Sequence, residues 1–326
     1  MSVNFQAQAI LDIAEQAEIV GAPSPEELGA KGLRIVFKKT RGSLTPEVPD
    51  VGHVEDFSIQ GPGGKIPVRY YRPIGSELTQ TLPLLIYFHG GGWVVGDRDT
   101  HDVICRMLAN RGQFAVINVD YRLAPENKFP AAVEDAWAVF KWAVGGAGGH
   151  AIDVDRIAVG GDSAGGNLSA VVAIMARDIG LNLSFQALIY PATSFHLNTA
   201  SHKIFYKGYL LTREAQDWYH AQYLRNESDR DDWRASPMLS DNLRDVAPAF
   251  ILTCGYDPLV DEGRSYAEKL KQAGVQIKYR CFEGQVHGFI TMGRAIDEAN
   301  EAVYEVADSI SSAFKEPLRL LNTKVS

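Results

Sequence analysis

The chain has 326 residues, of which 46% are hydrophobic and 22% are charged. These proportions are ordinary for a globular protein, and the length allows one large α/β domain or two smaller ones with a sizeable core. The formal net charge is −8, and no run of five or more Lys or Arg occurs. A nucleic-acid partner is therefore not expected.

The first twenty residues lack the basic start and continuous apolar centre of a signal peptide. Their pattern predicts an amphipathic helix instead. The apolar positions on this helix are Phe5, Ile10, Ile13 and Val20.

Neither apolar runs nor cysteine spacing indicates an extracellular or membrane-bound protein. No apolar run reaches the roughly 18 residues that a transmembrane helix needs. Cys105, Cys254 and Cys281 are far apart and form no CxxC pair, which suits a reducing compartment. We therefore expect a cytoplasmic protein without membrane contact.

Residues 1–81 contain a helix, a loop and a proline-containing stretch, followed by two alternating runs at 54–61 and 65–73. The sequence GPGG at 61–64 joins these runs and is a strong turn signal. This arrangement predicts a β-hairpin.

From residue 82 onward, short apolar runs alternate with helical patterns. The runs cover 82–90, 114–122, 156–163, 185–191, 249–257 and 277–284, and the helical patterns include 101–112, 131–144 and 164–178. Most runs are apolar on both faces, which predicts an α/β fold with a mostly parallel sheet covered by helices. Ligand sites in such folds lie beyond the carboxyl ends of the strands.

One long segment, residues 192–241, interrupts this alternation and is rich in aromatic residues. It is too long for an ordinary connection between a strand and a helix. We interpret it as an inserted helical cap. The alternative is additional core covering that makes no contact with a substrate.

The sequence Gly161-Asp162-Ser163-Ala164-Gly165 follows a predicted strand and opens a predicted helix. This G-x-S-x-G pattern, in that setting, is typical of a nucleophile elbow, in which glycines permit a sharp turn. Ser163 would then project its hydroxyl above the sheet, as a nucleophile that needs a base.

The order Ser, acid, His expected of this fold class selects the remaining catalytic candidates. Asp257 follows an apolar run, and His287 is the only histidine after it. Asp261 and Glu262 are alternative acids, although their place in the first turn of a predicted helix also suits the helix dipole. Asp257 as a simple turn cap and His287 as a structural histidine also stay open. The other seven histidines show no metal-ligand spacing.

The glycine run in HGGGW, residues 89–93, follows the first central strand, where its backbone N–H groups could bind an anion. There is no GxxxxGK[ST], and no acidic residue at dinucleotide-binding spacing, so phosphate binding is disfavoured. The backbone N–H groups of Gly91, Gly92 and Ala164 are instead candidates for an oxyanion hole.

These motifs together resemble the hormone-sensitive-lipase family of α/β-hydrolases, whose bacterial members are mostly carboxylesterases, and Asp162 places the chain in the GDSAG branch. The resemblance covers nearly the whole chain. It depends on HGGGW (89–93), DYRLAPENKFPAAVEDA (120–136), GDSAGGN (161–167), DPLVDEG (257–263) and HGF (287–289).

The resemblance implies an α/β-hydrolase fold with a mostly parallel sheet of about eight strands, flanking helices and a helical cap. The implied divisions are 1–50 (N-terminal cap part), 51–191 (core), 192–245 (cap insertion) and 246–326 (core). It also implies Ser163, Asp257 and His287 as the triad, Gly91, Gly92 and Ala164 as the oxyanion hole, no cofactor or metal, and a homodimer.

The expected activity is hydrolysis of short- to medium-chain acyl esters, with a small-molecule ester as the binding partner. Residues expected to contact the substrate are Trp93, Phe205, Tyr206, Tyr209 and Leu210. Each aromatic residue among them could equally be cap core. An amidase or peptidase of the same fold, or a non-catalytic binding protein, are the alternatives. No role is assigned to Cys254 beyond that of a small buried residue.

Overall fold

A single eight-stranded sheet forms the centre of the molecule, seen in a computed structural model that describes residues 2–316. The strands are β1 (His53–Gly61), β2 (Gly64–Arg72), β3 (Leu82–Phe88), β4 (Ala115–Val119), β5 (Ile152–Asp162), β6 (Phe185–Ile189), β7 (Ala249–Tyr256) and β8 (Ile277–Val286). Their order across the sheet is β1-β2-β4-β3-β5-β6-β7-β8. β2 runs antiparallel to β1 and β4, and the other pairs are parallel. The predicted hairpin and parallel sheet are confirmed.

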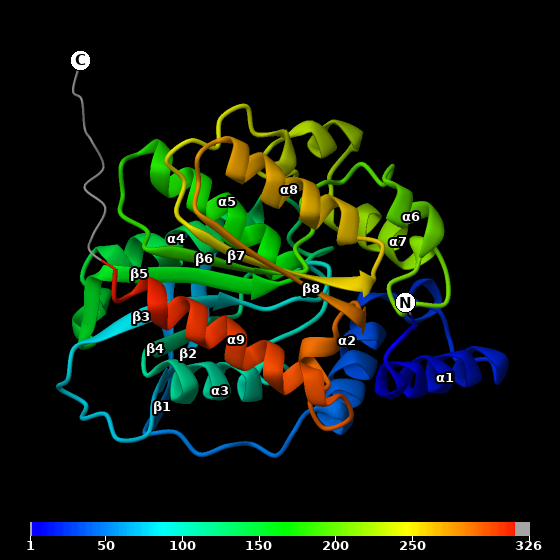
Figure 1. Ribbon diagram of the computed structural model, residues 1–326, viewed down its shortest axis with the longest axis horizontal. Coiled ribbons are helices and arrows are strands. Elements are labelled where there is room, and N and C mark those ends of the chain that lie inside the picture. The colour runs from blue at the N-terminus through cyan, green and yellow to red at the C-terminus, as the bar shows by residue number, and fades with distance from the viewer. Residues whose placement is uncertain (1, 317–326) are drawn as a thin grey trace.

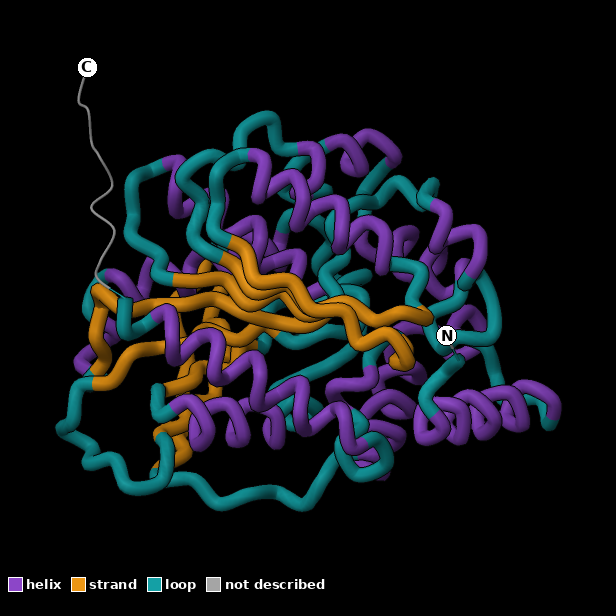
Figure 2. Tube along the Cα trace, in the orientation of Figure 1, coloured by secondary structure: helices purple, strands orange, loops and turns teal. Residues whose placement is uncertain are grey.

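Helices cover both faces of this sheet (Figures 1 and 2). One face carries α3 (Asp102–Gly112) and α9 (Asp297–Ala313), and the other carries α4 (Ala131–Val144), α5 (Ala164–Asp178) and α8 (Val260–Gln272). Strand side chains alternate between the two cores: Leu84, Ile86 and Phe88 of β3 enter one, and Leu85 and Tyr87 enter the other. This double burial explains the continuous apolar runs.

The N-terminal region contains two helices rather than the predicted single helix and loop. They are α1 (Phe5–Ile19) and α2 (Pro25–Leu44). α2 begins with a capping box in which Ser24 and Glu27 satisfy each other's backbone N–H groups, and Pro25 occupies the first helical position. This start signal was present in the sequence, so the predicted loop is wrong at this point.

The predicted apolar face of α1 is also wrong in most of its members. Phe5, Ile13 and Val20 are 80%, 66% and 80% exposed, and only Ile10 is buried among the four. The helix instead buries Ala7, Ile10 and Leu11. These residues are spaced i, i+3 and i+4, which places them on one face.

The long insertion folds into short helices at the carboxyl ends of the strands, beside α1 and α2 (Figure 1). It contains α6 (Ala200–Ile204), α7 (Arg213–Tyr223) and the 3-10 turns η2 (Glu227–Asp231) and η3 (Pro237–Leu239). α7 packs against α2, so the N-terminal region and the insertion meet. Two further 3-10 turns are η1 (Ala147–Gly149) and η4 (Phe289–Thr291). Within residues 2–316, no helix is long and apolar enough to cross a membrane.

Candidate active site

Ser163 lies in the tight turn between β5 and α5 with an unusual backbone conformation, φ 55° and ψ −115°. Such a conformation is costly for a residue with a side chain and persists only where the surroundings enforce it. The end of β3 packs directly against this turn. A Cβ atom at Gly165 would collide with the carbonyl of Phe88, so the close approach requires glycine there.

The structure brings Ser163, His287 and Asp257 into one hydrogen-bonded chain. The distance from Ser163 Oγ to His287 Nε2 is 2.9 Å, and that from His287 Nδ1 to Asp257 Oδ2 is 2.7 Å. Asp257 is fully buried just beyond β7, where its Oδ1 accepts the N–H of Leu259 at 2.8 Å. Ser163 and His287 are only half-buried, so they are reachable from solvent.

The alternative acids have other partners. Asp261 Oδ2 accepts the N–H of Ser201 at 2.8 Å, and Glu262 Oε1 accepts the N–H of Thr193 at 2.6 Å. Neither is hydrogen-bonded to His287. Both carboxylates instead attach the insertion to the start of α8.

The glycine loop after β3 presents free backbone donors near Ser163. Gly91 has φ 119° and Gly92 has φ 57°, and the Gly91 carbonyl accepts N–H groups from Val94 and Val95. The N–H groups of Gly91 and Gly92 form no hydrogen bond with any residue in the described part of the chain. Ala164 begins α5, so its N–H has no partner within the helix and lies at the positive end of the helix dipole.

Asp162 is a functional-site residue to which the sequence analysis gave no structural role. It is buried, and its Oδ1 accepts hydrogen bonds from the Tyr87 hydroxyl and the Gly90 N–H, each at 2.9 Å. His101 Nε2 lies 3.2 Å from the same oxygen. Asp162 therefore connects the serine turn to the glycine loop.

The charge of Asp162 is stabilised despite its burial. Burial alone would raise its pKa, but His101 and the hydrogen bond from Tyr87 lower the pKa to about 2. The second position of G-x-S-x-G accepts many residues, so the motif did not single this carboxylate out. An acidic residue at the end of a buried strand was the available signal.

Trp93, predicted to contact the substrate, lies inside an aromatic cluster between the glycine loop and the insertion. Its ring stacks on Tyr223 with centroids 4.4 Å apart and on Phe195 with centroids 5.1 Å apart. The side chain is buried, and its Nε1 has no hydrogen-bond partner in the described chain. Its role as a substrate contact stays a prediction.

The other four predicted substrate contacts lie around α6 and the loop that follows it. Phe205 and Tyr209 pack on each other and on Tyr256, the residue before Asp257. Leu210 is half-buried, whereas Tyr206 is 58% exposed. Phe205 and Tyr209 therefore pack against the residue that precedes the proposed acid in the chain.

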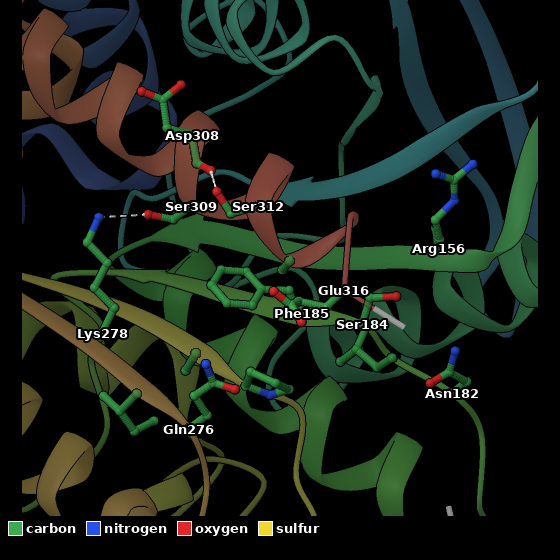
Figure 3. A pocket seen from close by; sticks show the side chains of 15 residues that line it. Arg156, Asn182, Ser184, Phe185, Gln276, Lys278, Asp308, Ser309, Ser312 and Glu316 are labelled. Carbon is green, nitrogen blue, oxygen red and sulfur yellow. Dashed lines mark hydrogen bonds between the residues drawn. The ribbon is translucent and has the colours of Figure 1, made fainter. Parts of the chain in front are cut away.

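A separate pocket of about 460 Å³ lies at the opposite end of the sheet (Figure 3). Phe185, Ala249 and Ile277 line it from the amino ends of β6, β7 and β8, together with the end of α9. Lys278 donates to Ser309 across this region at 3.1 Å. The serine turn and the glycine loop do not line this pocket.

A serine held by a histidine and a buried aspartate, beside free backbone donors, defines the serine-hydrolase class of site. Comparison with known proteins agrees with that class. Residues 85–291 match the family model described as alpha/beta hydrolase fold. The chain therefore belongs to the α/β-hydrolase family.

Relatives in this family include proteins named as ester hydrolases. The carboxylic ester hydrolase LipN of Mycobacterium tuberculosis is 48% identical over 250 residues, which cover 73% of this chain and 65% of LipN. The ethyl acetate hydrolase of Pseudomonas putida is 35% identical over 95% of this chain and 99% of its own length.

Solved structures show the same similarity. The ester hydrolase EH1AB1 from the metagenome of Lake Arreo, solved with a derivative of bipyridine phosphonate, superposes with a TM-score of 0.93 at 39% identity. The match covers 97% of this chain and all of that one. The predicted fold, family and esterase type are confirmed.

Proposed function

We propose that this protein is a carboxylesterase that cleaves short- to medium-chain acyl esters, with Ser163 as nucleophile, His287 as general base and Asp257 as the acid that orients it. The observation that carries the proposal is the continuous hydrogen-bonded chain from Ser163 Oγ through the His287 ring to the buried Asp257. A serine hydroxyl needs such a base to attack a carbonyl carbon at neutral pH.

Acylation begins when Ser163 Oγ attacks the ester carbonyl and His287 Nε2 takes its proton. The Asp257 carboxylate accepts the Nδ1–H of His287, which leaves Nε2 free to act as the base and stabilises the imidazolium that forms. His287 then gives the proton to the departing alcohol oxygen. An acyl-enzyme on Ser163 remains.

The negative charge on the former carbonyl oxygen is held by the N–H groups of Gly91, Gly92 and Ala164. Backbone donors held by a folded loop and a helix start need little reorganisation, which is the condition under which such stabilisation is large. Asp162 supports this arrangement because it binds the Gly90 N–H next to the donors. Water activated by His287 then attacks the acyl-enzyme and releases the carboxylic acid.

The helical regions at the carboxyl ends of the strands form the cap in this proposal, with residues 1–50 and 192–245 as its two parts. Their meeting at α2 and α7 supports this division. Trp93, Phe205, Tyr206, Tyr209 and Leu210 contribute apolar surface for the acyl group. The cytoplasm is the proposed location and a homodimer the proposed assembly, as the cysteine spacing and the family resemblance suggest.

The direct test is hydrolysis of p-nitrophenyl esters by the wild type and by Ser163→Ala. The wild type should favour butyrate to hexanoate esters, and Ser163→Ala should lose activity while its melting temperature stays within a few degrees. Near wild-type turnover by Ser163→Ala would disprove the assignment. A rate that keeps rising beyond about twelve acyl carbons would disprove the proposed chain-length preference.

A further inference from the structure

Three basic residues on α2, Arg34, Lys38 and Arg41, are spaced i, i+4 and i+7 and so share one face of the helix. The first two attach the helix to the catalytic core. Arg34 pairs with Glu126 at 2.7 Å and donates to the carbonyls of Val94 and Ala124. Lys38 pairs with two aspartates, Asp97 and Asp99.

Arg41 differs from these two residues because its guanidinium has no anionic partner. No hydrogen bond or ion pair joins the guanidinium to any residue between 2 and 316, and its Cζ lies over the Phe37 ring, 5.0 Å from the ring centroid. The residue is only half-buried, so its donors are still accessible. Helix attachment therefore does not account for this charge.

The guanidinium lies beside the proposed catalytic base. A Cβ atom placed on Gly288, the residue after His287, would be 3.0 Å from Arg41 Nη2. Tyr190, whose ring centroid is 4.7 Å from that of His287, lies close enough to Arg41 to influence its pKa. Arg41 is thus on the His287 side of the site.

The same charge is also close to the glycine loop. Tyr219 of α7 lies close enough to Arg41 to influence its pKa, and a Cβ atom on Gly92 would collide with the Tyr219 ring. A substrate carbonyl held between His287 and the Gly92 N–H would therefore have a cation near one of its substituents.

The surroundings leave this cation poorly compensated. Burial lowers the pKa of Arg41, and the offsetting interactions come from Tyr190, Asp162 and Tyr219. The two tyrosines are neutral at physiological pH, and burial raises the pKa of both further. Asp162 is already bound by Tyr87, Gly90 and His101.

We propose that Arg41 binds a carboxylate carried by the substrate, so that the preferred ester is an anionic one. A guanidinium presents donors in a planar fork that matches a carboxylate, and such charge-assisted pairs are strong where water is partly excluded. The inference rests on the proposed esterase function and names its substrate class. The carboxylate could be on the acyl or the alcohol part of the ester, and the test separates these cases.

The test compares two matched pairs of esters by kcat/KM. Monoethyl succinate and ethyl butyrate share the alcohol and the acyl length and differ in a terminal carboxylate on the acyl side. Acetoxyacetate and acetoxyacetamide differ in a carboxylate on the alcohol side. The wild type should prefer the anionic member of one pair, and that pair identifies the side that Arg41 contacts.

Arg41→Met should reduce kcat/KM for the preferred anionic ester by roughly 10- to 100-fold. The neutral partner should change by less than about threefold. Arg41→Lys keeps the charge but lacks the planar fork of donors. Its kcat/KM for the anionic ester should lie between those of the wild type and Arg41→Met. Lys39→Met is the matched control, because Lys39 is an exposed cation on the same helix and its loss should leave both ratios unchanged.

Two results would overturn the inference while leaving the esterase function intact. One is a wild type that hydrolyses the neutral esters and shows no preference for the anion in either pair. The other is a kcat/KM that falls equally for charged and neutral esters in Arg41→Met. If Arg41→Met does not fold, the same comparison is made with Arg41→Lys. A wild type inactive on every ester tested, charged and neutral alike, would instead contradict the proposed function, and the inference with it.

Discussion

Glu262 offers a test of how the insertion is attached to the core, through a pH-dependent stability. It lies on α8 and is 2% exposed. Its Oε1 accepts the Thr193 N–H at 2.6 Å, and its Oε2, which has no hydrogen bond in the described chain, is 3.4 Å from Nε2 of the buried His202 on α6. Burial raises the pKa of Glu262 to about 8 from its ordinary value of 4.5.

The sign of the effect follows from which state holds the proton. Between pH 4.5 and about 8 the folded protein keeps a proton on Glu262 that the unfolded chain releases. The folded state is therefore favoured at low pH, and this contribution is lost as the pH rises through about 8. The free energy of unfolding should fall by about 1.4 kcal/mol per pH unit in this window, or by about 5 kcal/mol in all.

Glu262→Gln removes the titration while retaining an acceptor for Thr193 and adding a donor toward His202. Urea unfolding should show similar stability for variant and wild type near pH 4.5. The variant should be the more stable protein by about 5 kcal/mol at pH 9. Glu268→Gln, on the exposed side of the same helix, is the matched control and should show no such trend. A difference between Glu262→Gln and wild type that is independent of pH would refute the reasoning.

Three further predictions concern the proposed catalytic groups. Asp257→Asn should lower kcat by roughly 10³- to 10⁴-fold, because the Asn amide would favour the wrong histidine tautomer; a loss below tenfold in steady-state assays would argue for another acid. Asp162→Asn should reduce the free energy of unfolding by about 1.5–3 kcal/mol, because a neutral amide replaces the charged acceptor that Tyr87, Gly90 and His101 share; urea unfolding that matches the wild type would contradict this. Gly91→Ala should lower kcat by about 10²-fold or more and also destabilise the protein, because its Cβ would overlap the Val95 carbonyl and φ is 119°; a fully active, equally stable variant would show that the loop is only a turn.

The sheet was predictable because its central strands are buried on both faces and each contributes a continuous apolar run. The order of motifs along the chain was likewise sufficient to nominate Ser163, Asp257 and His287, because strand ends in a parallel sheet meet at one edge. The structure places these side chains within hydrogen-bond distance. Their catalytic roles await the mutational tests.

The proposed cap region was less predictable because tertiary contacts decide its structure. α2 has no fully buried residue, and its apolar side chains Leu33 and Phe37 are only half-buried, so a buried apolar face contributes little to its position. Its attachment depends on ion pairs with residues about 60 to 90 positions away in sequence, such as Glu126. The place of Arg41 beside Gly288 depends on the same long-range docking and has no local signature.

The most direct measurement of the central claim is covalent labelling of the purified protein with a fluorophosphonate, followed by peptide mapping. An activated serine reacts with such a reagent, whereas an ordinary hydroxyl or a non-catalytic binding site does not. The account predicts one label per chain, located on Ser163, and loss of hydrolysis of p-nitrophenyl butyrate in proportion to the fraction of protein labelled. His287→Ala should not be labelled. An unlabelled Ser163 in a folded wild-type protein, or hydrolysis that survives complete labelling, would contradict it.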